Sequence, residues 1–319
     1  MKLVLWFEPE RVYAGTWLYT QRPQWLLGRG PTRLLNLGIP EARAWLTEHI
    51  DRFITEQGVD LYRQDFNIQP LPYWRANDAP DRQGITEIRH VEGYLAFWDE
   101  LRRRHPGMLI DSCASGGRRN DLETLRRAVP LLRSDYQAPQ NPNGTAAQRD
   151  ELIMGNQGHT YGLAMWVPFY GTGEYYKDAY SFRSHLCPSQ GVGGDCREPS
   201  EWKALQKVIS DWRSVAKDFY GDYYPLTAYS LGQEAWMAWQ FNRPEEGTGF
   251  VQVFRRSESA YETARFRLRG LDASASYQIR SFDEEAVQTV AGKELLEKGL
   301  PVSLPQPRSA VVLAYKRAN

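Results

Sequence analysis

GVDLYRQDFN, residues 58–67, is the segment that decides the predicted fold of this 319-residue chain. Val59 and Leu61 are apolar and the run is short, so it predicts a buried strand rather than a helix. Asp65 stands at the carboxyl end of this strand, and a proline-rich loop comes next. Folds in which strands and helices alternate carry their reactive groups at this end of the strands. A lone aspartate here also fits a structural cap of the next turn, so other segments must decide between the two interpretations.

Short apolar runs alternate with amphipathic segments along residues 1–225. Such alternation predicts parallel strands with right-handed crossovers, in a barrel or an open doubly wound sheet. Besides the segment above, the predicted strands are 3–7, 108–110, 129–132, 161–169 and one near Leu186. The predicted helices are 40–58, 88–101, 121–128, 146–155 and 199–219. About six strands are fewer than the eight of a closed barrel, so we expect a partial (β/α) TIM-type barrel.

Two further regions complete the predicted organisation. Residues 11–40 place aromatic side chains among glycine and proline, which predicts a long functional loop or lid. After about Pro225 the apolar residues follow period two, which predicts an antiparallel β-sandwich over residues 226–319. Its predicted strands are 235–241, 250–254, 266–268, 277–282 and 311–315.

The composition narrows the class of partner. The chain has 39 basic and 39 acidic side chains, and zero net charge argues against nucleic acid or an anionic membrane. Aromatic residues make up 13%, which favours carbohydrate because aromatic faces stack on sugar rings, although they also build cores. Three cysteines do not form a disulfide framework, and no long apolar run or signal peptide is found, so a cytoplasmic location is expected. The five histidines lack metal-ligand spacing, so no metal or other cofactor is expected.

Carboxylates come after three of the predicted strands: Glu8 and Glu10, Asp65, and Asp135. Two carboxylates from different strand ends are what cleavage of a glycosidic bond requires. One attacks the anomeric carbon, and the other protonates the leaving oxygen. Of Glu8 and Glu10, one is expected to hold a ligand hydroxyl or a barrel arginine rather than to react.

Four motifs, in this order and spacing, resemble the α-galactosidases (melibiases) of glycoside hydrolase family 36. They are WFEPE at 6–10, RQDFN at 63–67, SCASGG at 112–117 and SD at 134–135. Residues 291–300 also resemble the end of that family's β-sandwich. The resemblance implies a retaining hydrolase acting on terminal α-galactosides or a related sugar, with Asp65 as nucleophile and Asp135 as acid/base.

The resemblance also implies a set of sugar-binding residues. These are Trp6, Glu8, Arg63, Asn67, Cys113, Gly116, Gly117 and Arg119. Arg63 replaces a lysine of the family, and its planar fork is larger. Arg119 also fits an ion pair, for example with Asp121. Trp166, at the end of the predicted strand 161–169, fits either a pocket wall or the core.

The chain departs from the family in lacking its N-terminal β-sandwich, the first two barrel strands and the aspartate pair that grips galactose. The sugar, its anomer and its linkage are therefore open. A non-catalytic carbohydrate-binding relative, a glycosidase of altered specificity and a piece of a longer enzyme are the alternatives. A partial barrel leaves sheet edges and an apolar face uncovered, so we expect a homo-oligomer.

Overall fold

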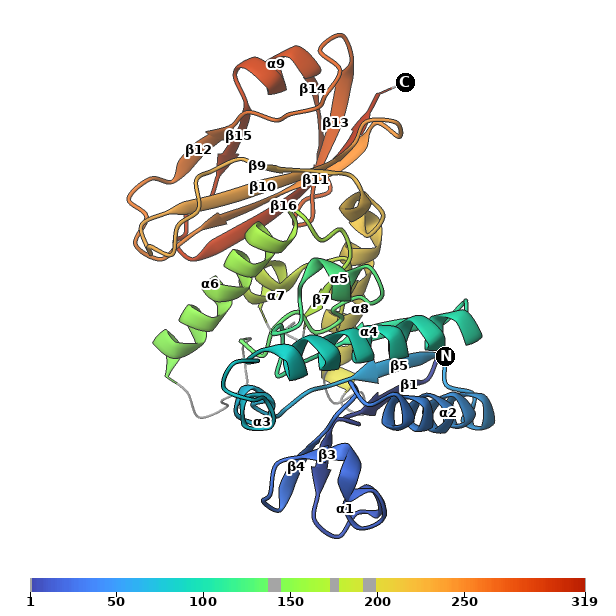
Figure 1. The fold of residues 1–319 in the computed structure, drawn as a ribbon. Coiled ribbons are helices and arrows are strands. Elements are labelled where there is room, and N and C mark those ends of the chain that lie inside the picture. The colour runs from blue at the N-terminus through green and yellow to red at the C-terminus, as the bar shows by residue number, and fades with distance from the viewer. Residues whose placement is uncertain (1, 137–144, 173–177, 192–198, 319) are drawn as a thin grey trace. The chain divides into compact units, whose positions relative to one another are not determined.

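The computed structural model describes residues 2–136, 145–172, 178–191 and 199–318. The chain divides into two compact units, unit 1 (Met1–Asp135) and unit 2 (Tyr136–Asn319), and each is described by itself (Figure 1). The domain boundary predicted at residue 225 falls inside unit 2 and stays a prediction.

A three-stranded parallel sheet forms the centre of unit 1, in the order β1-β5-β6. Its strands are β1 (Val4–Phe7), β5 (Leu61–Gln64) and β6 (Leu109–Ser112). The register places Trp6 beside Arg63 and Arg63 beside Asp111, so these three side chains share one face of the sheet. The predicted strand 129–132 is reduced to a single bridge between Asp111 and Val129.

Helices cover the opposite face of this sheet, as the apolar spacing predicts (Figure 1). The long pair is α2 (Pro40–Gln57) and α4 (Ile85–Arg104). Proline at the first position starts α2, and Gly58, with a φ of 65°, ends it in the left-handed conformation. Two shorter helices are α3 (Leu71–Asn77) and α5 (Leu122–Leu125), the latter capped by the Asp121 side chain.

Residues 11–40 are not the long loop that we predicted. They form an antiparallel sheet in the order β2-β4-β3. Its elements are β2 (Arg11–Tyr13), α1 (Trp17–Gln21), η1 (Pro23–Trp25), β3 (Leu26–Leu27) and β4 (Thr32–Leu35). Strands of two to four residues contain too few alternations for a period-two pattern, although Leu34 and Leu35 are completely buried.

The first part of unit 2 is mainly helical. Its elements are α6 (Ala146–Leu163), β7 (Gly171–Thr172), α7 (Ala179–His185), β8 (Ser189–Gln190), α8 (Pro199–Val215) and η2 (Asp218–Tyr220). The predicted strand 161–169 is wrong, because α6 continues to Leu163 and a turn comes after it. The predicted strand near Leu186 is likewise replaced by α7 and the two-residue β8, which pairs in parallel with β7. Short apolar runs do not separate helix from strand by periodicity alone.

The second part of unit 2 confirms the predicted antiparallel β-domain. A six-stranded sheet has the order β14-β13-β16-β11-β10-β9, and a second sheet pairs β12 with β15. The bounds are β9 (Asp222–Pro225), β10 (Trp236–Arg243), β11 (Thr248–Arg255), β12 (Thr263–Phe266), β13 (Ser276–Ser281), β14 (Val287–Ala291), α9 (Gly292–Glu297), β15 (Leu300–Ser303) and β16 (Ser309–Arg317). Alternation along β11 sends Phe250 and Phe254 to one core and Val251 and Val253 to another.

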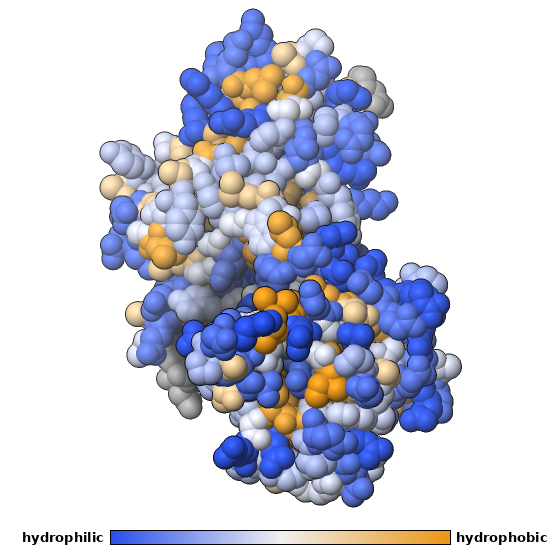
Figure 2. Space-filling model, in the orientation of Figure 1, coloured by the Kyte–Doolittle hydropathy of each residue, from blue (hydrophilic) through white to orange (hydrophobic). Residues whose placement is uncertain are grey.

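The visible surface is mainly hydrophilic, and its hydrophobic residues form separate groups rather than one continuous patch (Figure 2). Among the helices of the described residues, none is long and apolar enough to cross a membrane.

Candidate active site

Asp65 lies directly after β5, is only 8% exposed, and accepts hydrogen bonds on both carboxylate oxygens. Its Oδ1 accepts from the backbone N–H of Phe66 at 2.7 Å and of Ser115 at 3.1 Å. Its Oδ2 accepts from the indole Nε1 of Trp6 at 3.2 Å. Three segments therefore donate to this one carboxylate: the loop after β5, the loop after β6 and strand β1.

These donors determine the protonation of Asp65. Burial by itself would raise the pKa of this carboxyl group, because it disfavours the charged form. Hydrogen bonds from the Asn67 side chain, the Phe66 and Ser115 backbone and Trp6 outweigh burial and lower the pKa below its ordinary value. Asp65 is therefore an ionised carboxylate at neutral pH.

The turn at Ser115–Gly116 contacts both aspartates that the sequence singles out. Both residues have positive φ, 46° for Ser115 and 78° for Gly116. Ser115 donates its N–H to Asp65, while a Cβ on Gly116 would lie 2.6 Å from the Asp135 backbone nitrogen and 3.3 Å from its Cγ. Only a residue without a side chain allows Asp135 to lie this close. The turn thus brings carboxylates from positions 65 and 135 to one location.

Gly117 has the same role one residue later. A Cβ there would lie 2.7 Å from the Arg133 carbonyl oxygen. The two glycines therefore let the segment 133–135 pass directly over the turn. Both were predicted as sugar-pocket residues, and the structure gives them a packing reason beside Asp135.

Arg63 and Cys113 lie near Asp65 but are already engaged. Arg63 forms an ion pair with the buried Asp111 on the neighbouring strand, a partner that the sequence did not indicate. Cys113 is buried, and this burial raises the pKa of its thiol to about 11. The thiol is therefore neutral at physiological pH and is no thiolate nucleophile.

Glu8 accepts two hydrogen bonds from Asn67. Glu8 Oε1 accepts from the Asn67 backbone N–H at 2.7 Å, and its Oε2 from Asn67 Nδ2 at 3.4 Å. Arg11 forms an ion pair with the same carboxylate and also donates to the Asn67 carbonyl oxygen at 3.2 Å. This arrangement ties the loop after β1 to the loop after β5, beside Asp65.

Glu10 is completely buried and binds Arg119, as Glu8 binds Arg11, so each of the two glutamates holds an arginine. The bonds are 2.7 and 2.9 Å, and His90 Nε2 lies 2.7 Å from the same carboxylate. Burial would raise the pKa of Glu10, but Arg119 and His90 outweigh it and lower the pKa to about 2. Gln64 donates to Glu10 at 2.8 Å, and its side chain points to the opposite face of β5 from Asp65.

Arg119 was predicted to bind sugar, but two of its nitrogens bind Glu10, and its guanidinium lies over the rings of Phe66 and Tyr94. The alternative, an ion pair, describes its observed contacts, with Glu10 in place of Asp121. Arg118, which we did not predict, makes the contacts to the loops around Asp65. Arg118 and Arg119 are adjacent, so the sequence does not show which of them contacts the loops around Asp65. Only the side-chain contacts in the structure distinguish the two.

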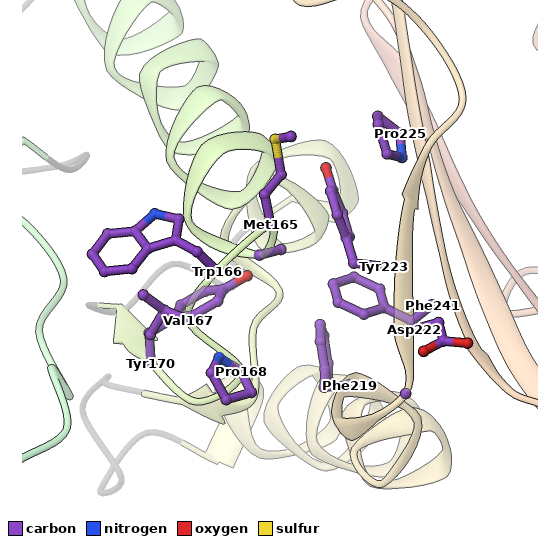
Figure 3. Close-up of a pocket in the computed structure, with 12 residues that line it drawn as sticks. Met165, Trp166, Val167, Pro168, Tyr170, Phe219, Asp222, Tyr223, Pro225 and Phe241 are labelled. Carbon is purple, nitrogen blue, oxygen red and sulfur yellow. The ribbon is translucent and has the colours of Figure 1, made fainter. Parts of the chain in front are cut away.

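Trp166 lies in unit 2, in the turn after α6, and is 46% exposed. It lines a pocket of about 380 Å³ together with residues of η2, β9 and β10 (Figure 3). Figure 3 shows the rings of Tyr170, Phe219, Tyr223 and Phe241 around this pocket, and Asp222 at one side. The predicted place of Trp166 at the sugar site stays a prediction.

Within the described ranges, no group of three or more histidine, cysteine, aspartate or glutamate side chains is arranged to hold a metal ion.

Two family models match the chain. The melibiase model matches residues 1–141, and the model of the glycosyl hydrolase family 36 C-terminal domain matches residues 236–314. These two parts of the chain are therefore similar to the family 36 α-galactosidases. The first match includes all four motifs around Asp65 and Asp135, and the second covers most of the β-domain.

Individual relatives are distant and longer. α-Galactosidase Mel36A of Lactobacillus acidophilus is 24% identical over 316 residues, which are 94% of this chain and 41% of the relative. AgaA of Geobacillus stearothermophilus is 24% identical over 325 residues, with the same two shares. The chain thus spans about two fifths of the length of these family 36 relatives.

Solved structures confirm the fold at the level of a partial barrel with a β-domain. The α-galactosidase of Lactobacillus brevis superposes with a TM-score of 0.79 at 21% identity, over 100% of this chain and 45% of that chain. A variant of AgaA solved in complex with raffinose superposes with a TM-score of 0.80 at 19% identity, with the same coverage.

Proposed function

We propose that this chain carries the bond-cleaving residues of a retaining glycoside hydrolase of the α-galactosidase type, with Asp65 as nucleophile and Asp135 as acid/base. The observation that supports it is the Ser115–Gly116 turn, which donates to Asp65 and packs against Asp135. Two carboxylates at one turn, one directly after β5 and one in the segment that comes after the bridge at Val129, suit a double displacement.

In the first step, ionised Asp65 attacks the anomeric carbon while Asp135 donates a proton to the leaving oxygen. The product is a covalent glycosyl-enzyme. In the second step, Asp135 removes a proton from water, which attacks the same carbon and releases the sugar. Trp6 and two backbone N–H groups hold Asp65 ionised before the attack and keep it oriented in both steps.

The proposed substrate is an oligosaccharide with a terminal α-galactoside or a related sugar. The names of the relatives support galactose, and the AgaA complexes with raffinose and stachyose concern that enzyme. Trp6 is 50% exposed and its indole N–H reaches Asp65, so its ring offers a stacking face beside the nucleophile.

The decisive test uses a panel of nitrophenyl α- and β-glycosides with wild type, D65N and D135N. One sugar should be cleaved by wild type and not by D65N, with the anomer of the product retained by NMR. D135N should keep activity on a dinitrophenyl glycoside, whose leaving group needs little protonation, and lose it on poorer leaving groups. D81N, at an exposed aspartate, is the control. Sugar binding without cleavage by wild type would favour the non-catalytic relative.

We also propose a cytoplasmic homo-oligomer. Supporting it, the face of the unit 1 sheet away from α2 and α4 carries Val4 and Leu109, each about half exposed at 46% and 49%. Light scattering after gel filtration tests the oligomer, and a monomer mass at micromolar concentration would refute it.

A further inference from the structure

Arg118 connects two loops beside Asp65. Its Nη2 donates to the carbonyl oxygens of Phe66 at 2.7 Å and Ile68 at 3.3 Å, in the loop after β5. Its Nε donates to the Ala114 carbonyl oxygen at 3.1 Å, and Nη2 to Ser115 Oγ at 3.0 Å, in the loop after β6. Nη1 reaches Gln69 Oε1 at 3.1 Å. One guanidinium therefore spans both loops.

The direction of the next hydrogen bonds follows from chemistry. A guanidinium has donors and no acceptor, so Ser115 Oγ accepts from Arg118. The one hydroxyl hydrogen of Ser115 is then directed to Asn67 Oδ1, at 2.9 Å. The Asn67 NH₂ group lies at the other side of the amide, where it donates to Glu8 Oε2 at 3.4 Å and lies near enough to Asp65 to lower the pKa of that carboxyl group. A flipped amide would place its oxygen against these two carboxylates.

We infer that Arg118 is a positioning residue that acts through Ser115 to fix the Asn67 amide with its NH₂ group toward Asp65 and Glu8. The inference rests on the proposed function for its effect on catalysis, while the geometry of the chain of hydrogen bonds is independent of it. Asn67 was predicted as a sugar-binding residue, and neither Arg118 nor Ser115 was predicted to have any role.

The consequence for Asp65 is an altered acid titration. The Asn67 side chain is the largest of the interactions that offset burial and lower the pKa of Asp65. Removing the Ser115 hydroxyl removes the donor that fixes the amide oxygen, and removing the guanidinium leaves that hydroxyl hydrogen free to turn to other acceptors. The pKa of Asp65 then rises, and less of the nucleophile is ionised at low pH.

The conformation of Ser115 guides the choice of variants. Its φ of 46° is unfavourable for a residue with a Cβ and persists because the surrounding contacts hold it. S115G removes the hydroxyl and relieves the strain, so a loss of activity in this variant reports the hydroxyl. R118M keeps an unbranched, flexible stem and removes all donors. R126M is the matched control, because the Arg126 side chain is 71% exposed and its ion pair is with Glu123.

The kinetic test measures kcat/KM against pH for wild type, R118M, S115G, the double variant and R126M. R118M and S115G should each move the acidic limb to higher pH and lower kcat/KM on the order of tenfold on that limb, as expected for loss of one hydrogen bond to a charged group. The double variant should equal the stronger single variant, because both act through one chain of bonds. Multiplying effects, or an R118M profile equal to that of R126M, would overturn the inference.

A second measurement separates this inference from the proposed function. The NMR signals of the Asn67 side-chain NH₂ group are assigned by their loss in N67D. Their chemical shifts should change with the ionisation of Asp65 in wild type and R126M, and should no longer do so in S115G and R118M. This readout needs no turnover, so it stands if wild type cleaves no glycoside. Unchanged signals in S115G, which keeps Arg118 intact, would refute the inference even if R118M does not fold.

Discussion

Replacing Gly116 by alanine tests the packing that joins the two aspartates. The new Cβ would lie 2.6 Å from the Asp135 backbone nitrogen and 3.3 Å from its Cγ, so Asp135 must move. The φ of 78° costs about 1–2 kcal/mol for a residue with a Cβ, and overpacking costs roughly 1–3 kcal/mol. We expect a loss of roughly 2–5 kcal/mol in the free energy of unfolding. A carboxylate displaced by a large fraction of an ångström should lower kcat/KM on the order of a hundredfold.

Gly58→Ala is the matched control. Gly58 also has positive φ, 65°, but a Cβ there would meet nothing within 4 Å. Urea unfolding should show only about 1–2 kcal/mol lost in G58A, with no change in kcat/KM. The loss in G116A should be larger for a poor leaving group than for dinitrophenolate, because Asp135 supplies the proton. Equal kinetics in G116A and G58A, or no dependence on the leaving group, would refute the reasoning.

Three further predictions concern buried ionisable groups. Glu10→Gln leaves Arg119 without its anionic partner, so it should lower the free energy of unfolding by about 3–5 kcal/mol in urea titrations. The pKa of Glu10 is lowered to about 2 from 4.5, so its stabilisation is complete above pH 4.5 and is lost as pH falls toward 2. Acid unfolding, monitored by fluorescence, should therefore begin between pH 4.5 and pH 2. A steeper dependence of stability on pH in E10Q than in wild type would contradict the assignment to Glu10. Cys113, with its pKa raised to about 11, should be alkylated by iodoacetamide far more slowly at pH 8 than in urea, as measured by mass spectrometry.

Much of the fold follows from local patterns. Apolar spacing of three and four predicts α2 and α4, and period two predicts the β-domain, because each face of these elements meets one continuous core. The same reasoning failed at residues 11–40 and 161–169. There the strands are very short, or a helix continues through an apolar run, and burial in the assembled unit decides between helix, strand and turn.

The sequence by itself determined the positions of Asp65 and Asp135 at the ends of apolar runs and the motifs that resemble those of the family 36 α-galactosidases. It also predicted that Glu8 or Glu10 holds a ligand hydroxyl or a barrel arginine, but not which pair forms. Tertiary structure decided that Glu10 binds Arg119, that Arg63 binds Asp111, and that Arg118 spans the loops beside Asp65. The physical reason is that hydrogen bonds depend on distance and direction. The bonds of Arg63 and Arg119 join residues that are 48 and 109 positions apart in the sequence. Glycines also let two chain segments come into contact, which local patterns do not reveal.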